Sequence, residues 1–223
     1  MHVRMDSWMM RLGCALAVVW LAGCSALPSR PAASVRYDLG LADVNPPAAT
    51  ASAPMVAPVP LVMAPVQALN MPEGMTAMLY RLNYADGQQL RAYQNARWSQ
   101  PPAQMLEQRL RMRLGLERPL LSERDEISFR TPDNRMLAVL KVELNEFSHV
   151  FESVSSSYAL VHVRASLIAR DAQSGGNMLQ GQRILTAQVP ATSADAAGGA
   201  QAMAAAVDEV AGQLSRWLQT YGR

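Results

Sequence analysis

The chain has 223 residues, and its 20 lysines and arginines nearly balance its 18 aspartates and glutamates. A formal net charge of +2 does not favour nucleic-acid binding, which usually relies on a strongly basic surface. Both cysteines lie within the first 24 residues, so disulfides do not stabilise the rest of the chain.

The first 23 residues have the pattern of a secretory signal peptide. Arg4 and Arg11 precede ten residues without a charge, LGCALAVVWL, and small residues follow. This run is about half of the ~20 apolar residues that a helix needs to cross a bilayer. We therefore predict that residues 1–23 are a signal peptide that is removed, and not a permanent membrane span.

The apolar run ends in LAGC, which resembles the lipobox of bacterial lipoproteins. The resemblance implies cleavage between Gly23 and Cys24, with Leu21 and Ala22 completing the motif. The resemblance also implies that Cys24 carries diacylglycerol and an N-linked chain such as palmitate. A single acyl chain binds membranes at only about 10⁴ M⁻¹, so two or three chains anchor the protein durably. Ser25 is not the aspartate that retains such proteins in the inner membrane. The resemblance thus implies an outer-membrane anchor facing the periplasm, and we expect no cofactor beyond this covalent lipid.

Removing 23 of 223 residues leaves 200, enough for one domain with a sizeable core and hardly enough for two. We assign residues 1–23 to the signal peptide and residues 24–33 to the lipidated cysteine and a short, prolyl linker. Residues 34–223 then form a single domain. The extended linker reaches at most about 35 Å, so we expect the domain to stay close to the membrane surface.

The domain opens with two segments of strand character. Residues 34–40, SVRYDLG, alternate and predict a strand with Tyr37 and Leu39 on one face. Residues 55–69 are apolar but contain three prolines, which cannot donate a hydrogen bond to a neighbouring strand. This second pattern predicts an edge strand that is bulged or interrupted.

Residues 77–85 predict the next strand, and Asp86-Gly87 predicts a hairpin turn into a further strand. Alternation places four side chains of the first strand on one face: Met78, Tyr80, Leu82 and Tyr84.

Pro101 and Pro102 predict the start of a helix, and Gly115 predicts its end. Its leucines share a stripe that predicts a core-facing side, whereas its arginines fall elsewhere and predict a solvated face. The leucines are Leu106, Leu110 and Leu114, and the arginines are Arg109, Arg111 and Arg113.

Residues 136–147, 158–169 and 177–189 predict three long strands joined by short loops, which favours an antiparallel meander. A long helix follows, with capping-box spacing between Thr192 and Asp195 and a glycine pair in its first turn that permits close packing. Its core-facing stripe contains Met203, Val207, Val210, Leu214, Trp217, Leu218 and Tyr221. The predicted fold class is α/β (an α+β sandwich), with one mainly antiparallel sheet and two helices packed on it.

Few residues favour catalysis. The serines 155–157 lie near His149 in the sequence and His162 stands in a predicted strand, but no G-x-S-x-G motif surrounds the serines. Two scattered histidines do not make a metal-binding pattern. The chain has two glycine pairs, Gly175-Gly176 and Gly198-Gly199, and neither has the spacing of a phosphate-binding loop. We predict a binding or assembly protein with no catalytic residues and no metal site. A lipid hydrolase that uses one of these serines with a histidine remains an alternative.

Six stretches of the chain resemble the ABC-type transport auxiliary lipoprotein family, which includes the paraquat-inducible protein C type. They are YDLG, LYRLNYADGQQLRAYQNARWSQPPAQMLEQRLR, LKVELNEFSHVFES, ALVHVRASLIARD, LQGQRILTAQVP and SADAAGGAQAMAAAVDEV. The most specific of them contains Trp98 followed by Pro101 and Pro102. Together they span almost the whole chain after the predicted signal peptide.

The resemblance implies a periplasm-facing outer-membrane lipoprotein that docks a mammalian-cell-entry (MCE) domain protein of an ABC-type lipid transporter. The implied partners are that protein and the membrane, reached through the lipid anchor, with no nucleic acid. A homo-oligomer would match a ring-shaped partner. The alternative is an outer-membrane assembly lipoprotein that acts as a plug or chaperone of a β-barrel.

Five residues are candidates for docking the partner. Methionine offers adaptable apolar surface, although the same residues also fit a core-filling role. The candidates are Trp98, Pro101, Pro102, Met55 and Met63.

Overall fold

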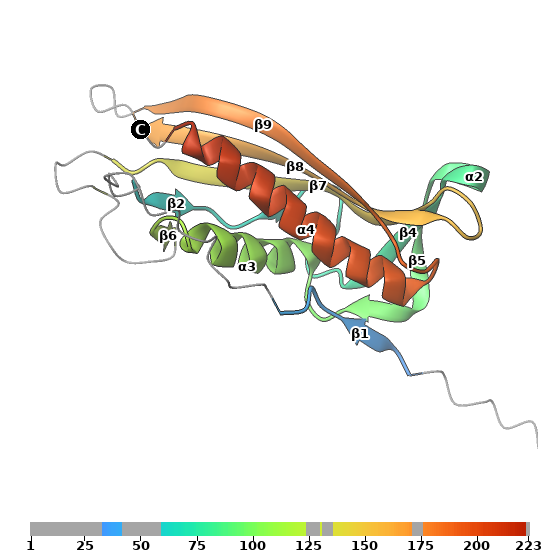
Figure 1. The fold of residues 1–223 in the computed structure, drawn as a ribbon. Coiled ribbons are helices and arrows are strands. Elements are labelled where there is room, and N and C mark those ends of the chain that lie inside the picture. The colour runs from blue at the N-terminus through green and yellow to red at the C-terminus, as the bar shows by residue number, and fades with distance from the viewer. Residues whose placement is uncertain (1–32, 42–58, 124–129, 131–135, 171–175, 222–223) are drawn as a thin grey trace, which may run out of the picture. The chain divides into compact units, whose positions relative to one another are not determined.

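The computed structural model describes residues 33–41, 59–123, 130, 136–170 and 176–221. Within them the chain forms a sheet of nine strands, with two long helices lying side by side against it (Figure 1). The fold class is the predicted α/β sandwich. In chain order the elements are β1 (Val35–Tyr37), β2 (Leu61–Met63), β3 (Gln67–Ala68), β4 (Ala77–Leu82), α2 (Asn83–Asp86), β5 (Gly87–Trp98), α3 (Pro102–Gly115), β6 (Leu120–Ser122), β7 (Val139–Phe151), β8 (Ser157–Arg170), β9 (Asn177–Pro190) and α4 (Ala196–Gln219).

β7 is the strand around which the sheet is built. Along one edge it pairs antiparallel with β8, from Phe151 opposite Ser157 to Val139 opposite Ile168. Along the other edge it pairs in turn with β2, β3 and β4, each parallel to it. The chain from β2 to β4 thus runs beside β7 in three short steps and leaves it between β3 and β4.

The proline-rich segment is interrupted as predicted, because Pro65 lies between β2 and β3. The prediction of an edge strand is right for β3, which pairs with β7 alone among the described strands, and wrong for β2, which lies between β6 and β7. β2 itself contains no proline, so its N–H groups alternate toward both neighbours. Leu61 donates to the Pro119 carbonyl at 3.1 Å, and Val62 donates to the Ala138 carbonyl at 3.0 Å.

β7, β8 and β9 form the predicted antiparallel meander, and each extends beyond its predicted C-terminal end. β8 pairs with β9 from Tyr158 opposite Pro190 to Arg170 opposite Asn177. Alternate side chains of β8 face the helices and have no exposed surface: Ala159, Val161, Val163 and Ala165.

β4 and β5 pair antiparallel, but the connection differs from the predicted hairpin. β4 ends at Leu82 and the four-residue helix α2 follows, so Tyr84 does not continue the face of the strand. Gly87 has a φ of −68° and not the positive φ of a primed hairpin turn. The Asp86 carboxylate instead accepts a hydrogen bond from the Gln88 N–H at 3.1 Å, which closes the turn locally.

α3 completely buries the predicted leucine stripe, Leu106, Leu110 and Leu114. The prediction of a solvated arginine face is wrong for Arg109, which is only 4% exposed. Its guanidinium donates to the carbonyl oxygens of Leu39 and Gly40 and forms a 3.4 Å ion pair with Asp208 of α4. A buried charge needs such partners, and these tie α3 both to the segment after β1 and to α4.

α4 packs on β8 and β9 through the predicted stripe, which is buried except for Tyr221, a residue beyond the end of the helix. The N-cap is Asp195 and not Thr192, so the predicted capping box is wrong. The helix begins three residues later than a capping box at Thr192 would require. Asp195 therefore takes the N-cap position, and its carboxylate accepts a hydrogen bond from the Gly198 N–H at 2.8 Å.

The first turn of α4 lies very close to the sheet. A Cβ atom on Gly199 would lie 2.4 Å from Nδ1 of His149 on β7, closer than real Cβ contacts allow. Glycine at this position therefore lets the helix backbone approach the strand, as the glycine pair predicted.

We expect Gly199→Ala to destabilise the protein by about 1–3 kcal/mol, because the added methyl overpacks the contact with His149. Gly212→Ala, on the same helix, is the matched control. Its Cβ would meet only the flexible end of Arg216 at 3.4 Å. This change should stabilise the protein by roughly 0.5–1 kcal/mol. Urea denaturation of the two variants measures the difference, and equal effects would contradict the close approach.

Candidate functional site

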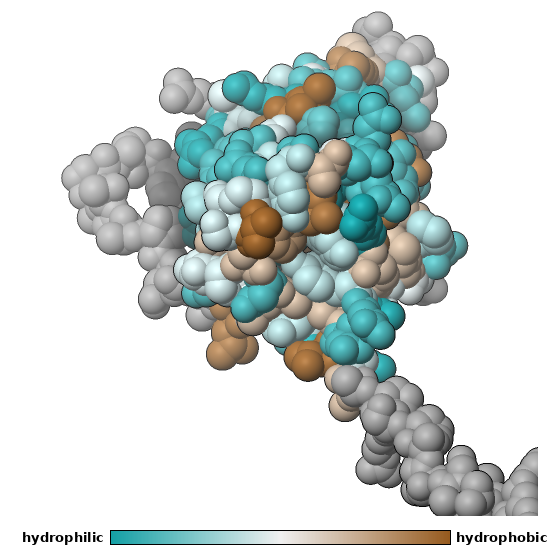
Figure 2. Space-filling model, turned by 90° about the vertical axis from the view of Figure 1, so that its right-hand side faces the viewer, coloured by the Kyte–Doolittle hydropathy of each residue, from teal (hydrophilic) through white to brown (hydrophobic). Residues whose placement is uncertain are grey.

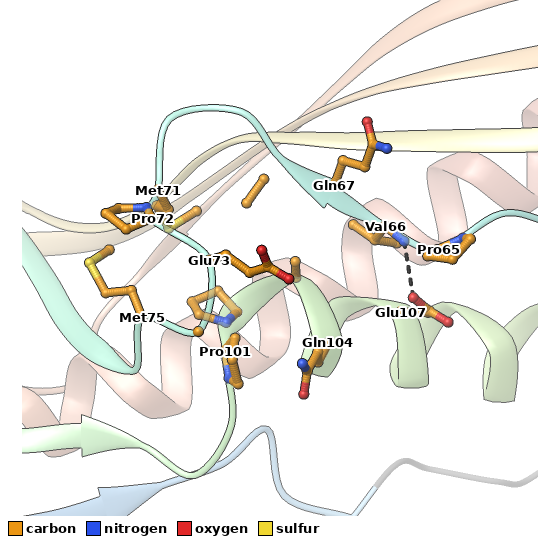
Figure 3. Close-up of a pocket in the computed structure, with 14 residues that line it drawn as sticks. Pro65, Val66, Gln67, Met71, Pro72, Glu73, Met75, Pro101, Gln104 and Glu107 are labelled. Carbon is orange, nitrogen blue, oxygen red and sulfur yellow. Dashed lines mark hydrogen bonds between the residues drawn. The ribbon is translucent and has the colours of Figure 1, made fainter.

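A groove of about 470 Å³ opens beside β3 (Figure 3). It is lined by residues 65–68 around β3, residues 71–75 of the following loop, residues 101–104 at the start of α3, and Glu107. Its volume falls within the roughly 300–1,000 Å³ of typical ligand sites. We call this feature the β3 groove.

The β3 groove lies where the sheet is incomplete. β6 pairs with β2 and β5 pairs with β4, whereas β3 has no neighbour other than β7 among the strands that the structure describes. The Val66 N–H points away from β7, to Glu107, and the Leu69 N–H points toward β7, to the Leu144 carbonyl at 3.2 Å. Because backbone groups alternate along a strand, the N–H and carbonyl of Ala68 face the groove.

Glu107 joins the two long walls of the groove. Its Oε2 accepts the Val66 N–H at 3.0 Å, which Figure 3 marks, and its Oε1 accepts from Arg111 Nε at 3.0 Å. Arg111 also donates to the Met63 carbonyl at 2.8 Å. Two side chains of α3 thus satisfy backbone groups at the end of β2 and the start of β3, and they hold the helix against this strand edge.

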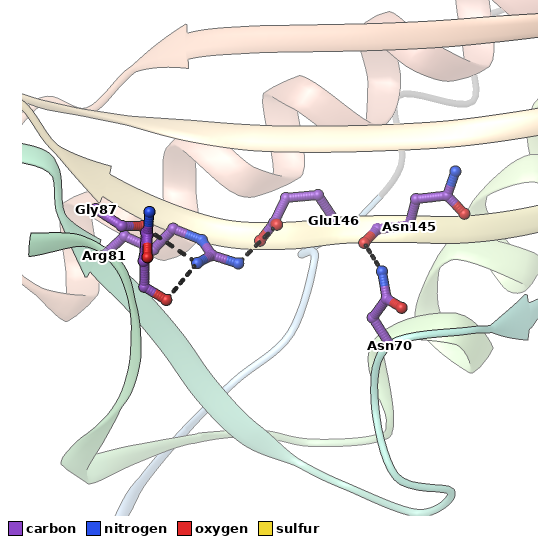
Figure 4. Close-up of polar contacts among 6 residues, drawn as sticks. Asn70, Arg81, Gly87, Asn145 and Glu146 are labelled. Carbon is purple, nitrogen blue, oxygen red and sulfur yellow. Dashed lines mark hydrogen bonds and ion pairs between the residues drawn. The ribbon is translucent and has the colours of Figure 1, made fainter.

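The third wall is the loop between β3 and β4, and polar contacts fix it in place. The Asn70 amide donates to the Asn145 carbonyl at 3.2 Å, at the point where the register of β7 and β8 shifts (Figure 4). Gly74 has a φ of +76°, a conformation that glycine adopts without strain, and it allows the tight turn from Pro72 to Met75. The loop is therefore held by the bulge in β7.

Figure 4 also shows the contacts that fix the far end of β4. Arg81 forms a 2.9 Å ion pair with Glu146 of β7 and donates to the Gly87 carbonyl at 3.3 Å. Both Arg81 and Glu146 are partly exposed, so the pair contributes orientation more than stability. It secures the return of the chain to β7 after the loop.

The lining combines apolar side chains with acidic groups. Met71 and Met75 of the loop and Pro101 and Gln104 at the start of α3 all line the groove (Figure 3). The charged residues of the lining are Glu73, which is exposed, and Glu107; none of the described lining residues is basic. Such a surface can bind an apolar group beside a cation, and it holds no nucleophile with an adjacent base.

The structure corrects part of the predicted docking surface. Trp98 is 1% exposed and packs edge-on against Phe147, and Met63 is completely buried. Both predictions are wrong, because each side chain fills the space between sheet and helices. Pro101 and Pro102, by contrast, line the β3 groove.

The methionines of this part of the chain divide in the same way. Met63 and Met78 fill the core, whereas Met71 and Met75 line the groove. The remaining candidates lie outside the described residues: Met55, the lipobox residues Leu21, Ala22 and Gly23, and Cys24.

The candidate hydrolase residues do not form a hydrogen-bonded pair in the part of the chain that the structure describes. Nδ1 of His149 lies 2.8 Å from the hydroxyl of Tyr93, while its Nε2 has no hydrogen-bond partner there. The hydroxyl of Ser156 donates to Glu152 at 3.4 Å, and that of Ser157 is buried without a partner. Nε2 of His162 likewise has none. Sequence proximity of serine and histidine was therefore misleading.

Burial explains the state of His149. It lowers the pKa of His149 to about 4, an effect that the negative charge of Asp195 partly opposes. Burial likewise raises the pKa of Tyr93, so its hydroxyl stays protonated. The Asp195 carboxyl has a lowered pKa, chiefly because it accepts the Gly198 N–H. A neutral imidazole packed between the rings of Tyr93 and Phe151 is a core group.

Other kinds of site are not found in the described residues. They contain no group of three or more histidine, cysteine, aspartate or glutamate side chains placed to hold a metal ion. None of their helices is both long and apolar enough to cross a membrane. At the end of the molecule that carries α2, hydrophobic residues form separate small patches among hydrophilic ones (Figure 2).

The fold and the groove together define a sheet-and-helix domain with a surface groove of a size suited to binding. The amino-acid sequence identifies the family to which this domain belongs. Residues 37–215 match the model of the ABC-type transport auxiliary lipoprotein component, and the chain belongs to this family.

Solved structures of similar fold include two with TM-scores above 0.5. A Xanthomonas campestris protein of family DUF330 is 19% identical, with 83% of this chain and 92% of that chain covered and a TM-score of 0.57. An uncharacterised protein is 13% identical, with 83% and 99% covered and a TM-score of 0.56. At these identities the similarity concerns the fold alone. No curated protein matches the chain in sequence.

We expect Glu107→Ala to destabilise the protein by about 1–3 kcal/mol, because it leaves the Val66 N–H and Arg111 without their shared acceptor. The exposed Glu209 of α4 provides the control, and Glu209→Ala should change stability by no more than about 0.5 kcal/mol. Urea denaturation measures both. Equal losses would show that Glu107 does not join the groove walls.

The buried histidine predicts a dependence of stability on pH. Between pH 6.5, its ordinary pKa, and about 4, its pKa in the fold, the unfolded chain binds a proton that the folded chain does not. Stability should therefore fall as the pH decreases through this range, by roughly 3 kcal/mol at pH 4, at about 1.4 kcal/mol per pKa unit.

Urea denaturation at pH 7 and at pH 4.5 tests this dependence. His149→Gln should remove most of it, while His162→Gln, a change to another strand histidine, should retain it. A pH dependence that survives in His149→Gln would assign the effect to other groups.

Proposed function

We propose that this chain is a non-catalytic auxiliary component of an ABC-type intermembrane lipid transport system. It is anchored through Cys24 to the periplasmic face of the outer membrane, and it docks the MCE-domain protein of the system. The observation that carries the proposal is the family match, which extends over residues 37–215 and so includes both long helices almost to the end of α4.

The sequence supports an auxiliary role. Neither glycine pair has the spacing of a phosphate-binding loop, so ATP hydrolysis would be the task of other subunits. Among the described side chains, the serines and histidines that a hydrolase would use are hydrogen-bonded elsewhere or lack a partner. The β3 groove offers a preformed surface for binding.

The predicted anchor defines where such binding would occur. From Cys24 to Ala33, the first described residue, the extended chain spans at most about 35 Å. A domain on this tether stays near the membrane and meets a partner that reaches across the periplasm from the other membrane.

A pull-down of the full-length lipoprotein from crosslinked membranes tests the proposal, with partners identified by mass spectrometry. We expect an MCE-domain protein together with the permease and ATPase subunits of its transporter. A variant in which a signal peptide that is cleaved without a cysteine replaces residues 1–24 cannot be acylated, and it should move to the soluble periplasmic fraction and recover much less of the partner. Recovery of a β-barrel protein alone would contradict the proposal and favour an assembly lipoprotein.

A further inference from the structure

We propose that the β3 groove binds a short extended peptide segment of the partner protein, which adds a strand to the free edge of β3. The segment places an apolar side chain among the methionines and prolines of the groove and carries a lysine or arginine next to it. This inference rests on the proposed function, because it specifies the contact through which the partner docks.

The backbone of β3 provides the first argument. Ala68 directs its N–H and its carbonyl away from β7, and no described strand covers that edge. An extended peptide can satisfy both groups with main-chain hydrogen bonds, which is how proteins commonly extend a sheet with a segment of another chain. The adjacent Val66 N–H is already used by Glu107, so the free edge is short and accepts a short strand.

The composition of the lining argues for a peptide over an acyl chain. The amide groups of Gln67 and Gln104 point away from the space between β3 and α3 (Figure 3), and Glu73 and Glu107 bring carboxylates to the groove. An acyl chain would bury these carboxylates and the Ala68 backbone without partners, which is costly. A peptide pairs with them through its own N–H and carbonyl groups and still fills the apolar part.

Charge argues for a basic segment. The described lining has two carboxylates and no lysine, arginine or histidine. Glu107 is already paired with Arg111, whereas Glu73 is exposed at the edge of the groove. A cationic side chain beside the apolar anchor would pair with Glu73, and an anionic lipid headgroup would be repelled.

The groove is preformed, so binding does not require ordering it first. The Glu107 contacts hold α3 against β3, and the Asn70 to Asn145 hydrogen bond holds the loop wall. A site fixed in this way loses little conformational entropy when a segment binds.

The test uses the purified chain from Cys24 onward and short overlapping peptides that tile the periplasmic part of the MCE-domain protein, read by fluorescence polarisation. We expect binding to be confined to peptides that combine an apolar residue with a neighbouring lysine or arginine. In a bound peptide, N-methylation of an amide whose N–H faces β3 should abolish binding, whereas N-methylation of the alternate amides should not. Binding that tolerates N-methylation throughout would overturn strand addition.

Substitutions locate the site. Ala103→Trp fills the groove from the first turn of α3 and should weaken peptide binding about tenfold or more, equivalent to 1.4 kcal/mol. Ala205→Trp, the same change at an exposed position of α4, should leave it unchanged.

Glu73→Lys, in an exposed loop position, should weaken binding of the basic peptides, and Glu209→Lys should not. Equal binding by Ala103→Trp and Ala205→Trp would place the peptide elsewhere and overturn the proposal.

The last arm separates this inference from the proposed function. If the MCE-domain protein is recovered from membranes but no tiled peptide binds, the groove assignment fails and the proposed function stands. If a fluorescent fatty acid binds in the groove and Ala103→Trp blocks it, while no peptide binds, the groove is a lipid site and the peptide proposal is overturned. If no transporter subunit is recovered at all, the proposed function itself fails.

Discussion

The two-sided pairing of β7 is the constraint on which the rest of the structure depends. β7 has 13 residues, and β8 pairs with one of its edges from Val139 to Phe151, interrupted only by the bulge at Asn145. The opposite edge needs a partner of similar length, and the chain from β2 to β4 provides it in three pieces, each parallel to β7. Pro65 and the turn at Gly74 break that partner, so the pieces cannot form one continuous strand. The β3 groove is the space that this broken pairing leaves.

Long polar side chains of α3 then compensate for the missing strand. Glu107 and Arg111 reach backbone groups near the break, and Arg109 reaches the carbonyl oxygens of Leu39 and Gly40. Each of these three side chains forms a hydrogen bond with a backbone group. Without that bond the backbone group would need a neighbouring strand as its partner or would remain unpaired beside the helix. The helix is therefore fixed by polar contacts at the groove and by its leucine stripe elsewhere.

The sequence predicted what depends on local periodicity. The three meander strands, both long helices and their apolar stripes follow from neighbouring residues, and the structure confirms them. The groove could not be predicted, because it depends on parallel pairing between segments far apart in the chain, such as Asn70 and Asn145, 75 residues apart. The same limit explains Arg109. On the helix alone it is one of several surface arginines, and its partner Leu39 lies 70 residues away. Trp98 was singled out by resemblance, which cannot distinguish a residue kept for packing from one kept for binding.

A small preformed groove and a membrane tether together suit a weak but local contact. The free edge of β3 is short and its groove accepts few side chains, so by itself it would give modest affinity. On the proposed function, the lipid anchor at Cys24 confines the domain to a layer next to the membrane. Confinement raises the effective concentration of the groove at the site where the partner arrives, in the way that a short linker raises it to about millimolar. Docking would then depend on the anchor as much as on the groove. The same contact would be too weak to capture the partner when the domain is free in the periplasm.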